Sequence, residues 1–254
     1  MAKANTTPGT LLACQWRDVV ALNFEADERA LAPYLPPGTR VARYNNHTML
    51  TLMAKNAREL QPWGGSLTLF RSVGSIDIRC YVQCETNSGI TVGHVVLRRM
   101  LSNKWCARLL RALYRTTCDV EKITHEAKNF ETAQRDALPS AEYRWTTGGE
   151  SNQFVVRARA AGRKPADQSR EDFVLHQRYR FAASPSGTRV SNIRQTPWVV
   201  WNASSGSYDC AETRWLGPGL SRYFRKPMSV MMSSGGEVKI HRPRALADFQ
   251  ANPS

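Results

Sequence analysis

Residues 75–82 read SIDIRCYV, and this stretch decides the predicted fold. Apolar and polar residues alternate along it with the period of two that is typical of a β-strand with two different faces. The apolar face consists of Ile76, Ile78, Cys80 and Val82. The other face carries an acid, a base and a phenol: Asp77, Arg79 and Tyr81. Such a face is either exposed to solvent or lines a polar cavity.

The chain as a whole is of a size and composition that suit one globular domain. It has 254 residues, of which 42% are hydrophobic, so it can bury a sizeable core, and we predict a single domain over residues 1–254. No apolar run approaches the roughly 20 residues that span a bilayer. The N-terminus lacks the apolar block of a signal peptide. The sequence therefore predicts a cytoplasmic protein without a transmembrane segment.

The charge of the chain is strongly positive. The formal net charge is +14, and only eight of the 35 basic residues are lysine. A basic protein attracts anions such as nucleic acid, acidic lipid or a small acid, and arginine suits planar contacts to carboxylates and phosphates. A GC-rich genome produces the same arginine bias. The six cysteines form no C-x-x-C pair and no zinc-type cluster with histidine, so we predict no metal site.

The pattern along the rest of the chain predicts many short strands and one main helix. Such spacing favours a mainly antiparallel barrel or sandwich. The helix is predicted from Ser102 or Asn103 to about Thr116, with Trp105, Leu109 and Leu113 on one side. Its basic stripe consists of Lys104, Arg108, Arg111 and Arg115. Residues 173–183 are predicted as a strand with a solvent face of His176, Arg178 and Arg180, and Gly235-Gly236 as a turn.

The order of these motifs resembles a known bacterial family. The matching motifs are LPPG (35–38), IDIRCYV (76–82), GITV (89–92), ARLL (107–110), FVLHQRYRF (173–181), TPWVV (196–200) and GGEVKIHRP (235–243). They resemble the YqjF-like domain of unknown function, in the acetoacetate decarboxylase-like superfamily, over residues 14–244. The resemblance implies a mainly β (α+β) fold, a double-sheeted antiparallel barrel or cone with one main helix. It also implies an interior that holds a small ligand.

The resemblance implies a catalytic site as well, and the sequence departs from it. The decarboxylase forms a Schiff base on a lysine whose pKa is lowered by a neighbouring lysine, but this chain has no Lys-Lys pair. Lys104 lies near that position, in the basic stripe, where an exposed lysine stays protonated. Relatives carry a glutamate four positions before the strand arginine, where this chain has Ser75. We therefore expect the pocket without the decarboxylase chemistry.

The polar face of residues 75–82 supplies the main candidate site. If the apolar face packs on a second layer, Asp77, Arg79 and Tyr81 face the interior of the barrel. Same-face neighbours lie roughly 7 Å apart, so Asp77 and Arg79 either form a structural ion pair or share a ligand. A ligand carboxylate binds a buried arginine through two parallel hydrogen bonds. We predict Arg79 as the anion contact, Asp77 as its orienting or proton-exchanging partner, and Tyr81 as a hydrogen-bond donor.

Three further residues are candidates, two of them with a purely structural alternative. Ser75 is predicted on the ligand-binding side of the strand. His94 alternates with Val92 and Val96, so it is either an acid–base residue or a core histidine. Trp198 is either a wall of the pocket or part of the core.

These observations predict a protein that binds a small organic acid or oxo compound inside a barrel, with no metal and no cofactor. If it is an enzyme, we expect a lyase or decarboxylase-like reaction, or an acid–base step, on a small oxo acid. The alternative is a basic surface protein that docks nucleic acid, an acidic membrane or an acidic partner through the helix stripe and the FRK (224–226) and HRPR (241–244) segments. The oligomeric state stays open, a homo-oligomer included.

Overall fold

The computed structural model describes residues 9–65, 67–86, 89–114, 118–130, 138–210 and 218–249. The strands are β1 (Thr10–Glu25), β2 (Arg40–Val41), β3 (Arg43–Tyr44), β4 (His47–Pro62), β5 (Phe70–Thr86), β6 (Gly89–Leu101), β7 (Asp119–Val120), β8 (Ile123–Lys128), β9 (Ser140–Thr147), β10 (Glu150–Ala158), β11 (Tyr179–Ser184), β12 (Gly187–Gln195), β13 (Val200–Asp209), β14 (Ser229–His241) and β15 (Arg244–Ala245). The helices are α1 (Glu28–Leu31), α2 (Lys104–Tyr114), α3 (Arg170–Leu175) and α4 (Pro218–Ser221), with 3-10 turns η1 (Ala32–Tyr34) and η3 (Leu246–Asp248).

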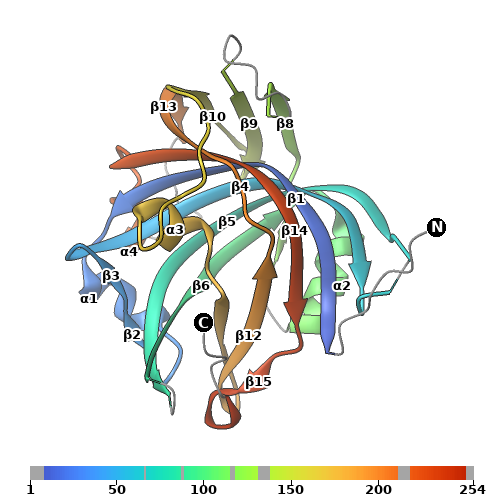
Figure 1. Cartoon of the computed structure of the whole chain (residues 1–254), viewed down its shortest axis with the longest axis vertical. Coiled ribbons are helices and arrows are strands. Elements are labelled where there is room, and N and C mark those ends of the chain that lie inside the picture. Colours follow the sequence, from blue (N-terminus) through green and yellow to red (C-terminus); the bar gives the residue numbers. More distant parts are fainter. Residues whose placement is uncertain are drawn as a thin grey trace.

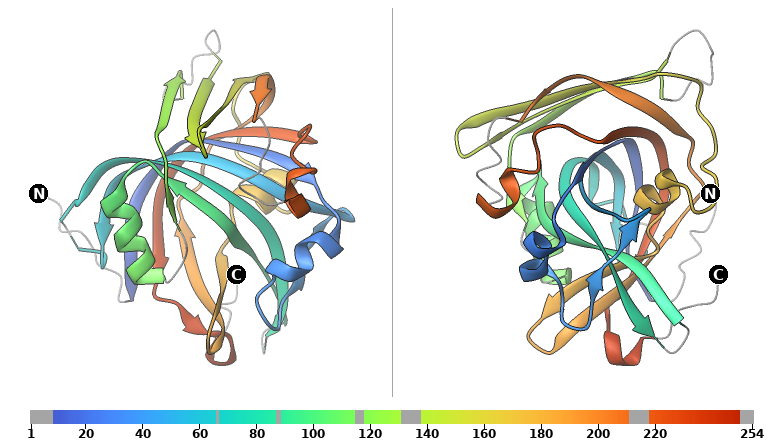
Figure 2. Two further views of the ribbon diagram at one scale, coloured as in Figure 1. Left: turned by 180° about the vertical axis from the view of Figure 1, so that it is seen from behind. Right: turned by 90° about the vertical axis from the view of Figure 1, so that its left-hand side faces the viewer.

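The long strands curl into a closed ring. The strands β11, β6, β5, β4, β1 and β14 pair in that order. Strand β12 pairs with both β11 and β14, and so joins the two ends of this series. All these pairings are antiparallel except that of β6 with β11. Strands β13, β10, β9 and β8 continue from β14 as a second layer that arches over the ring (Figures 1 and 2). This double-layered cone confirms the predicted fold class.

The two faces of β5 point into two different cores. Ile76, Ile78 and Cys80 lie in one buried cluster with aromatic side chains of β9 and β10, among them Tyr143 and Phe154. Tyr81 lies in the other cluster, inside the ring. Helices α2 and α3 contribute to that inner cluster, α2 through Cys106, Ala107 and Leu110 and α3 through Val174 and Leu175. The polar face of β5 therefore lines the interior of the ring.

Several local signals in the sequence form the structures that they predict. Asp27 caps α1 by accepting a hydrogen bond from the backbone N–H of Arg29. Asn45 and Asn46 adopt positive φ angles of 47° and 66° in the hairpin turn between β3 and β4. Asn103 caps α2, because its side-chain oxygen accepts hydrogen bonds from the backbone N–H groups of Trp105 and Cys106.

Two predictions about local structure are wrong. The first residues of the predicted strand at 173–183 belong to α3, which Ser169 caps. Gly235 lies within β14 and not in a turn before it. Trp105 is 57% exposed, because α2 buries Cys106, Ala107, Leu110 and Tyr114 instead. Arg115 lies outside the described residues, as do residues 131–137 of the strand that the sequence predicts at 129–137, and Asn129 and Phe130 lie after the end of β8.

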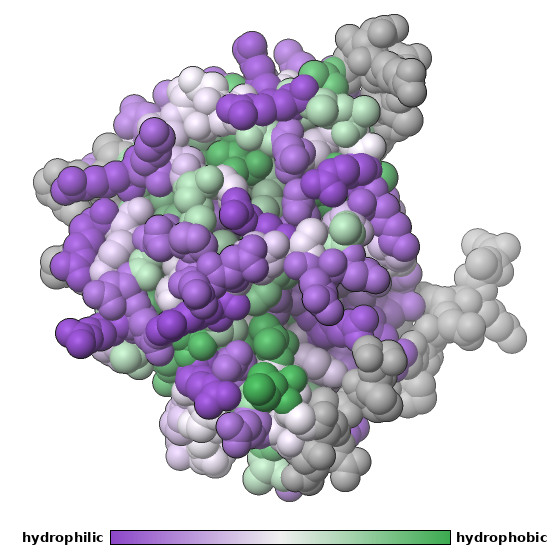
Figure 3. Space-filling model, turned by 60° about the vertical axis from the view of Figure 1, so that its left-hand side comes forward, coloured by the Kyte–Doolittle hydropathy of each residue, from purple (hydrophilic) through white to green (hydrophobic). Residues whose placement is uncertain are grey.

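The surface in Figure 3 is largely hydrophilic, and its hydrophobic side chains form small separate groups. That pattern is ordinary for a folded protein surface. Within the part of the chain that the structure describes, no helix is long and apolar enough to cross a membrane.

Candidate functional site: a buried cluster of cations around Asp77

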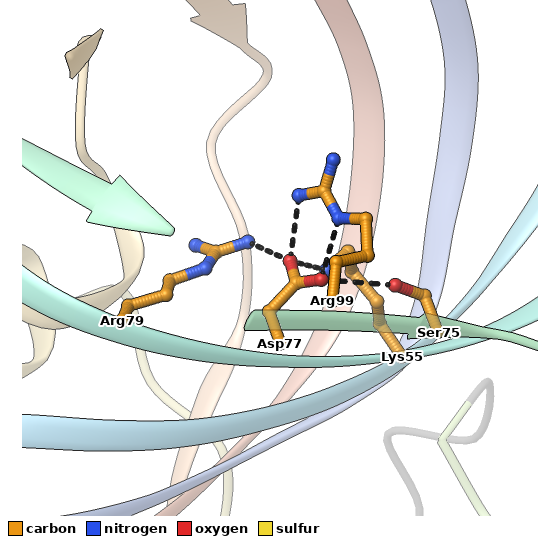
Figure 4. A network of polar contacts seen from close by, with 5 residues as sticks. All are labelled: Lys55, Ser75, Asp77, Arg79 and Arg99. Carbon is orange, nitrogen blue, oxygen red and sulfur yellow. Dashed lines mark hydrogen bonds and ion pairs between the residues drawn. The ribbon is translucent and has the colours of Figure 1, made fainter. Parts of the chain in front are cut away.

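The carboxylate of Asp77 is the centre of a buried polar cluster (Figure 4). Arg99 donates two hydrogen bonds to it, from Nε to Oδ1 at 2.7 Å and from a terminal nitrogen to Oδ2 at 2.9 Å. Oδ2 also accepts hydrogen bonds from Lys55 Nζ at 2.6 Å and from Arg79 at 2.9 Å. The hydroxyl of Ser75 donates to Oδ1 at 3.2 Å. The sequence-predicted residues Ser75, Asp77 and Arg79 are thus brought together.

Three adjacent strands of the ring supply this cluster. Lys55 lies on β4 and pairs in register with Ser75 of β5, and Asp77 of β5 pairs with Arg99 of β6. Inward-facing side chains on neighbouring strands lie close enough to contact each other directly. The side chain of Asp77 is 0% exposed, that of Arg79 2%, that of Lys55 3% and that of Arg99 11%.

The charges of this cluster do not balance within it. Three basic side chains surround one carboxylate. Burial by itself would raise the pKa of Asp77, but the charges of Arg99 and Lys55 outweigh that effect and hold this pKa well below its usual value. Asp77 is therefore ionised at neutral pH, and it can compensate only one of the three positive charges.

Lys55 relieves part of this imbalance by losing its proton readily. Burial lowers the pKa of Lys55 to about 7, and the neighbouring cations Arg79 and Arg99 act in the same direction against the attraction of Asp77. The Nζ atom of Lys55 also lies 4.7 Å from the ring centroid of Trp16, and the guanidinium of Arg79 lies 5.5 Å from it. The amine of Lys55 therefore loses its proton far more readily than that of an exposed lysine.

Two more basic residues lie on the same inner surface, next to this cluster. His94 on β6 pairs in register with Tyr81 on β5 and with Arg180 on β11. Burial lowers the pKa of His94 well below its usual value, and Arg79 and Arg180 add to the effect, so this histidine is neutral. Burial likewise lowers the pKa of Arg180, to about 10, with help from Arg99. Arg180 remains a cation at neutral pH.

Several nitrogens on this surface have no hydrogen-bond partner among the described residues. They are Nε of Arg79, Nε of Arg180 and Nδ1 of His94. Buried polar groups in folded proteins are usually paired, and leaving one unpaired is costly. Since the arginine nitrogens can only donate, they are suited to an acceptor such as a carboxylate.

The predicted donor Tyr81 already has a partner for its hydroxyl hydrogen. Its oxygen lies 2.8 Å from the hydroxyl of Thr51, which donates to Asn23 Oδ1 at 2.7 Å. Because the Thr51 hydrogen is used by Asn23, Tyr81 donates to Thr51. The ring of Tyr81 also packs on Phe173 of α3 at 4.7 Å between centroids. Tyr81 thus connects β5 to β4, close to but outside the Asp77 cluster.

The remaining two candidates lie in different places. Trp198 is buried, and its ring lies 5.9 Å from that of Trp16. Lys55 and Arg79 make cation–π contacts with the ring of Trp16. Trp198 is therefore part of the inner wall, one layer behind the cluster. Lys104 is exposed at the start of α2, with its Nζ 5.7 Å from the ring centroid of Trp105. The structure does not bring Lys104 into the interior.

The sequence interpretation missed three inward-facing cations. Lys55, which lies within β4, is absent from the sequence-based candidates. Arg99 was not considered either, and Arg180 was expected on a solvent face. Arg180 is 4% exposed, so that expectation is wrong. The alternation of Arg180 with Phe181 was visible in the sequence, but in a closed ring its polar face points inward.

The described residues offer no group of three or more His, Cys, Asp or Glu side chains that could hold a metal ion. All six cysteines are free thiols. Burial raises the pKa of Cys14, which lies near Lys55, to about 12, so this thiol stays protonated.

Comparisons with known proteins support this architecture. The structure is similar to the enduracididine biosynthesis enzyme MppR, complexed with the condensation product of pyruvate and imidazole 4-carboxaldehyde, with a TM-score of 0.64 and 11% identity over 98% of this chain and 94% of that one. Acetoacetate decarboxylase from Legionella pneumophila gives a TM-score of 0.63 and 14% identity over 97% and 91%. An acetoacetate decarboxylase-like enzyme from Sphingomonas wittichii RW1 gives 0.60 and 11% over 95% and 94%.

At these identities the similarity shows the fold, which is that of the acetoacetate decarboxylase-like proteins. No match is found among curated proteins. The sequence itself matches the family model DUF2071, described as an uncharacterized conserved protein, over residues 13–237. This match covers most of the chain and agrees with the YqjF-like resemblance of its motifs. The chain therefore belongs to the DUF2071 family and has an acetoacetate decarboxylase-like fold.

Proposed function

We propose that the interior of the ring binds a small organic acid, whose carboxylate contacts Arg79 and Arg99. The observation that carries this proposal is the charge imbalance around Asp77, where Lys55, Arg79 and Arg99 share one carboxylate in a buried setting. Removing charges from water costs several kcal/mol per ion unless each is paired. A ligand carboxylate would supply the missing negative charge.

The geometry favours Arg79 as the main contact. One of its terminal nitrogens bonds to Asp77, while its Nε has no partner among the described residues. A guanidinium in this state can still offer donors to a second carboxylate. Asp77 would then hold Arg79 and Arg99 in position, and Ser75 would hold Asp77.

The ligands bound to one protein of similar fold support a small oxo acid. MppR has been described in complex with pyruvate and with a condensation product of pyruvate. Pyruvate combines a carboxylate with a carbonyl group, and both are hydrogen-bond acceptors. His94 is buried and its Nδ1 has no hydrogen-bond partner among the described residues, so in the tautomer that carries the proton on Nδ1 it is a candidate donor to the second group of such a ligand.

The test is a thermal denaturation experiment with pyruvate, acetoacetate and a panel of small carboxylates, each compared with its uncharged amide. A ligand that binds only the folded state raises the melting temperature. At a concentration of 100 times its dissociation constant it adds about 2.7 kcal/mol to the free energy of unfolding. We expect the acids to raise the melting temperature and the amides to leave it unchanged. Arg79→Met should abolish the shift.

A matched control separates this site from the basic surface of α2. Lys104 and Arg108 are exposed on α2, and both cations lie over Trp105. The double variant Lys104→Ala/Arg108→Ala should keep the full shift. The proposal fails if no acid shifts the wild type, or if Arg79→Met keeps the shift while the α2 variant loses it.

A further inference from the structure

We infer that the ligand of the ring carries a second carboxylate, bound by Arg180 and Arg189 in a cavity where β11 and β12 meet the end of α2. This inference rests on the proposed function, because the first carboxylate is the one placed at Arg79 and Arg99. It makes the ligand a dicarboxylate.

The second site is a half-open cavity between β11, β12 and the end of α2. Its volume is about 60 Å³. A buried water occupies roughly 10–15 Å³ on this measure, so the cavity has room for about four waters, or for a carboxylate with its adjoining carbon. The residues around it that concern the argument are Tyr114, Arg180, Ser184, Arg189, Ser191 and Pro243.

This cavity is equipped to bind an anion. Arg180 is 4% exposed and Tyr114 9%, and neither Nε of Arg180 nor the hydroxyl of Tyr114 has a hydrogen-bond partner among the described residues. The guanidinium of Arg180 lies 5.1 Å from the ring centroid of Tyr114. No acidic side chain lines the cavity among the residues that the structure describes. Two guanidinium groups therefore face it without a carboxylate.

Arg189 is held in place at the rim. It donates a hydrogen bond to the backbone carbonyl of Pro243 at 3.0 Å, which fixes its orientation and leaves its charge uncompensated. Arg180 pairs in register with Ser191, two residues from Arg189 along β12 and on the same face. The two arginines thus come from adjacent strands and can share one anion.

Arg180 and the Asp77 cluster lie on neighbouring strands of the same inner surface, because Arg180 of β11 pairs in register with His94 of β6, and His94 pairs with Tyr81 of β5. Tyr81 is two residues from Arg79 on the same face of β5, so His94 lies between Arg180 and the strand that carries Arg79 and Asp77. Asp77 cannot compensate Arg180 as well, because its two oxygens already accept hydrogen bonds from three cations. One ligand with an acid group at each end satisfies both sets of donors.

The experiment is isothermal titration calorimetry with malonate, succinate, glutarate and adipate, each compared with its half-amide, and with acetate and propionate as monocarboxylates. We expect at least one dicarboxylate to bind about tenfold more tightly, or better, than its half-amide, which is the range for one charged hydrogen-bonded contact. Arg180→Met should reduce that dicarboxylate to the affinity of the half-amide. The affinity for monocarboxylates should stay within about twofold.

Two further variants keep the result interpretable. Arg178→Met changes an exposed arginine two residues from Arg180 and should have no effect. Arg189→Met changes the rim alone and should remove part of the gain, which keeps the inference testable if Arg180→Met does not fold.

The two proposals fail in different ways. Monocarboxylate binding with no gain for any dicarboxylate overturns the inference and leaves the proposed function standing. Absence of binding by every acid overturns both. A separate inorganic anion is the other source of the same chemistry in this cavity. If phosphate binds together with a monocarboxylate in an Arg180-dependent way while dicarboxylates gain nothing, the single-ligand inference is overturned.

Discussion

At the scale of single residues, Asp77 is the group on which the buried cluster depends. Its carboxylate is the acceptor for Lys55, Arg79 and Arg99. Asp77→Asn should lower the free energy of unfolding by about 3–5 kcal/mol, since removing one partner leaves buried charges uncompensated. Urea denaturation at pH 7 measures this loss.

A surface ion pair provides the matched control for Asp77. Asp119 accepts a hydrogen bond from Arg98 at 2.6 Å, but both side chains are about one-third exposed. Asp119→Asn should therefore cost at most about 1 kcal/mol. Adding Lys55→Met to Asp77→Asn should restore part of the stability, because one uncompensated cation is removed. Equal losses for Asp77→Asn and Asp119→Asn would contradict the assignment.

Lys55 gives the protein a distinctive pH dependence. Its pKa is about 7 in the folded protein, mainly through burial, and about 10.4 in an unfolded chain. Between these values the unfolded chain holds a proton that the folded protein lacks, so this group makes stability rise with pH. The slope is at most about 1.4 kcal/mol per pH unit, and it falls towards zero as the pH drops through the folded-state pKa and both states become protonated.

The comparison of wild type with Lys55→Met isolates this contribution. The cysteines, which titrate at high pH, are the same in both proteins and cancel. The stability of the wild type relative to the variant should rise between pH 7 and pH 9 and stay level between pH 5.5 and pH 6.5. A difference that is constant over the whole range would show that Lys55 keeps its proton.

At the scale of strands, strict alternation explains why part of the site could be predicted from the sequence. Residues 75–82 follow a period of two, so the inward positions of Asp77, Arg79 and Tyr81 were accessible from the pattern alone. Strand β6 breaks that rule. Its register with β5 shifts between Ile78 and Arg79, which inserts an extra residue.

This bulge changes which arginine of β6 faces inward. Counting in twos from His94 and Val96 gives Arg98, but Arg99 is the residue that reaches Asp77. Arg98 bonds to Asp119 instead. A bulge leaves no dependable mark in one sequence, because it is set by pairing with another strand. The inward position of Arg180 could not be predicted for a related reason. The pairing of β12 with β14 closes the ring, and this closure decides which face of β11 points inward.

Gly235 allows a test of strand geometry at one position. It has a φ of 69° within β14, and a Cβ atom there would lie 2.0 Å from the backbone oxygen of Trp16 on β1. Gly235→Ala therefore combines backbone strain with a clash against the neighbouring strand. Gly148, with a φ of 60° and open space around it, has the strain without the clash.

We expect Gly148→Ala to lose about 1–2 kcal/mol, the cost of the left-handed conformation. Gly235→Ala should lose clearly more, because the backbone of β1 or β14 must move. Chemical denaturation of both variants measures the difference. Similar losses would mean that the two strands separate easily at this point, in conflict with their pairing on either side of Gly235.

At the scale of the whole molecule, ligand binding, protonation and folding are linked through the same buried charges. A carboxylate bound near Arg79 adds negative charge beside Lys55 and raises the pKa of its amine above the value of about 7. At pH 8 Lys55 is mostly neutral in the free protein and gains a proton in the complex. Binding should therefore take up a fraction of one proton at pH 8 and almost none at pH 6, where Lys55 is already charged.

Calorimetry in Tris and in triethanolamine measures this uptake, since both buffers are cationic and do not compete for the site, while their heats of ionisation differ. The apparent binding enthalpy at pH 8 should depend on the buffer for the wild type. It should not do so for Lys55→Met, which retains the two arginines that contact the ligand. Buffer-independent heats for the wild type would show that the carboxylate binds too far from Lys55 to change its protonation, and would move the anion away from the Asp77 cluster.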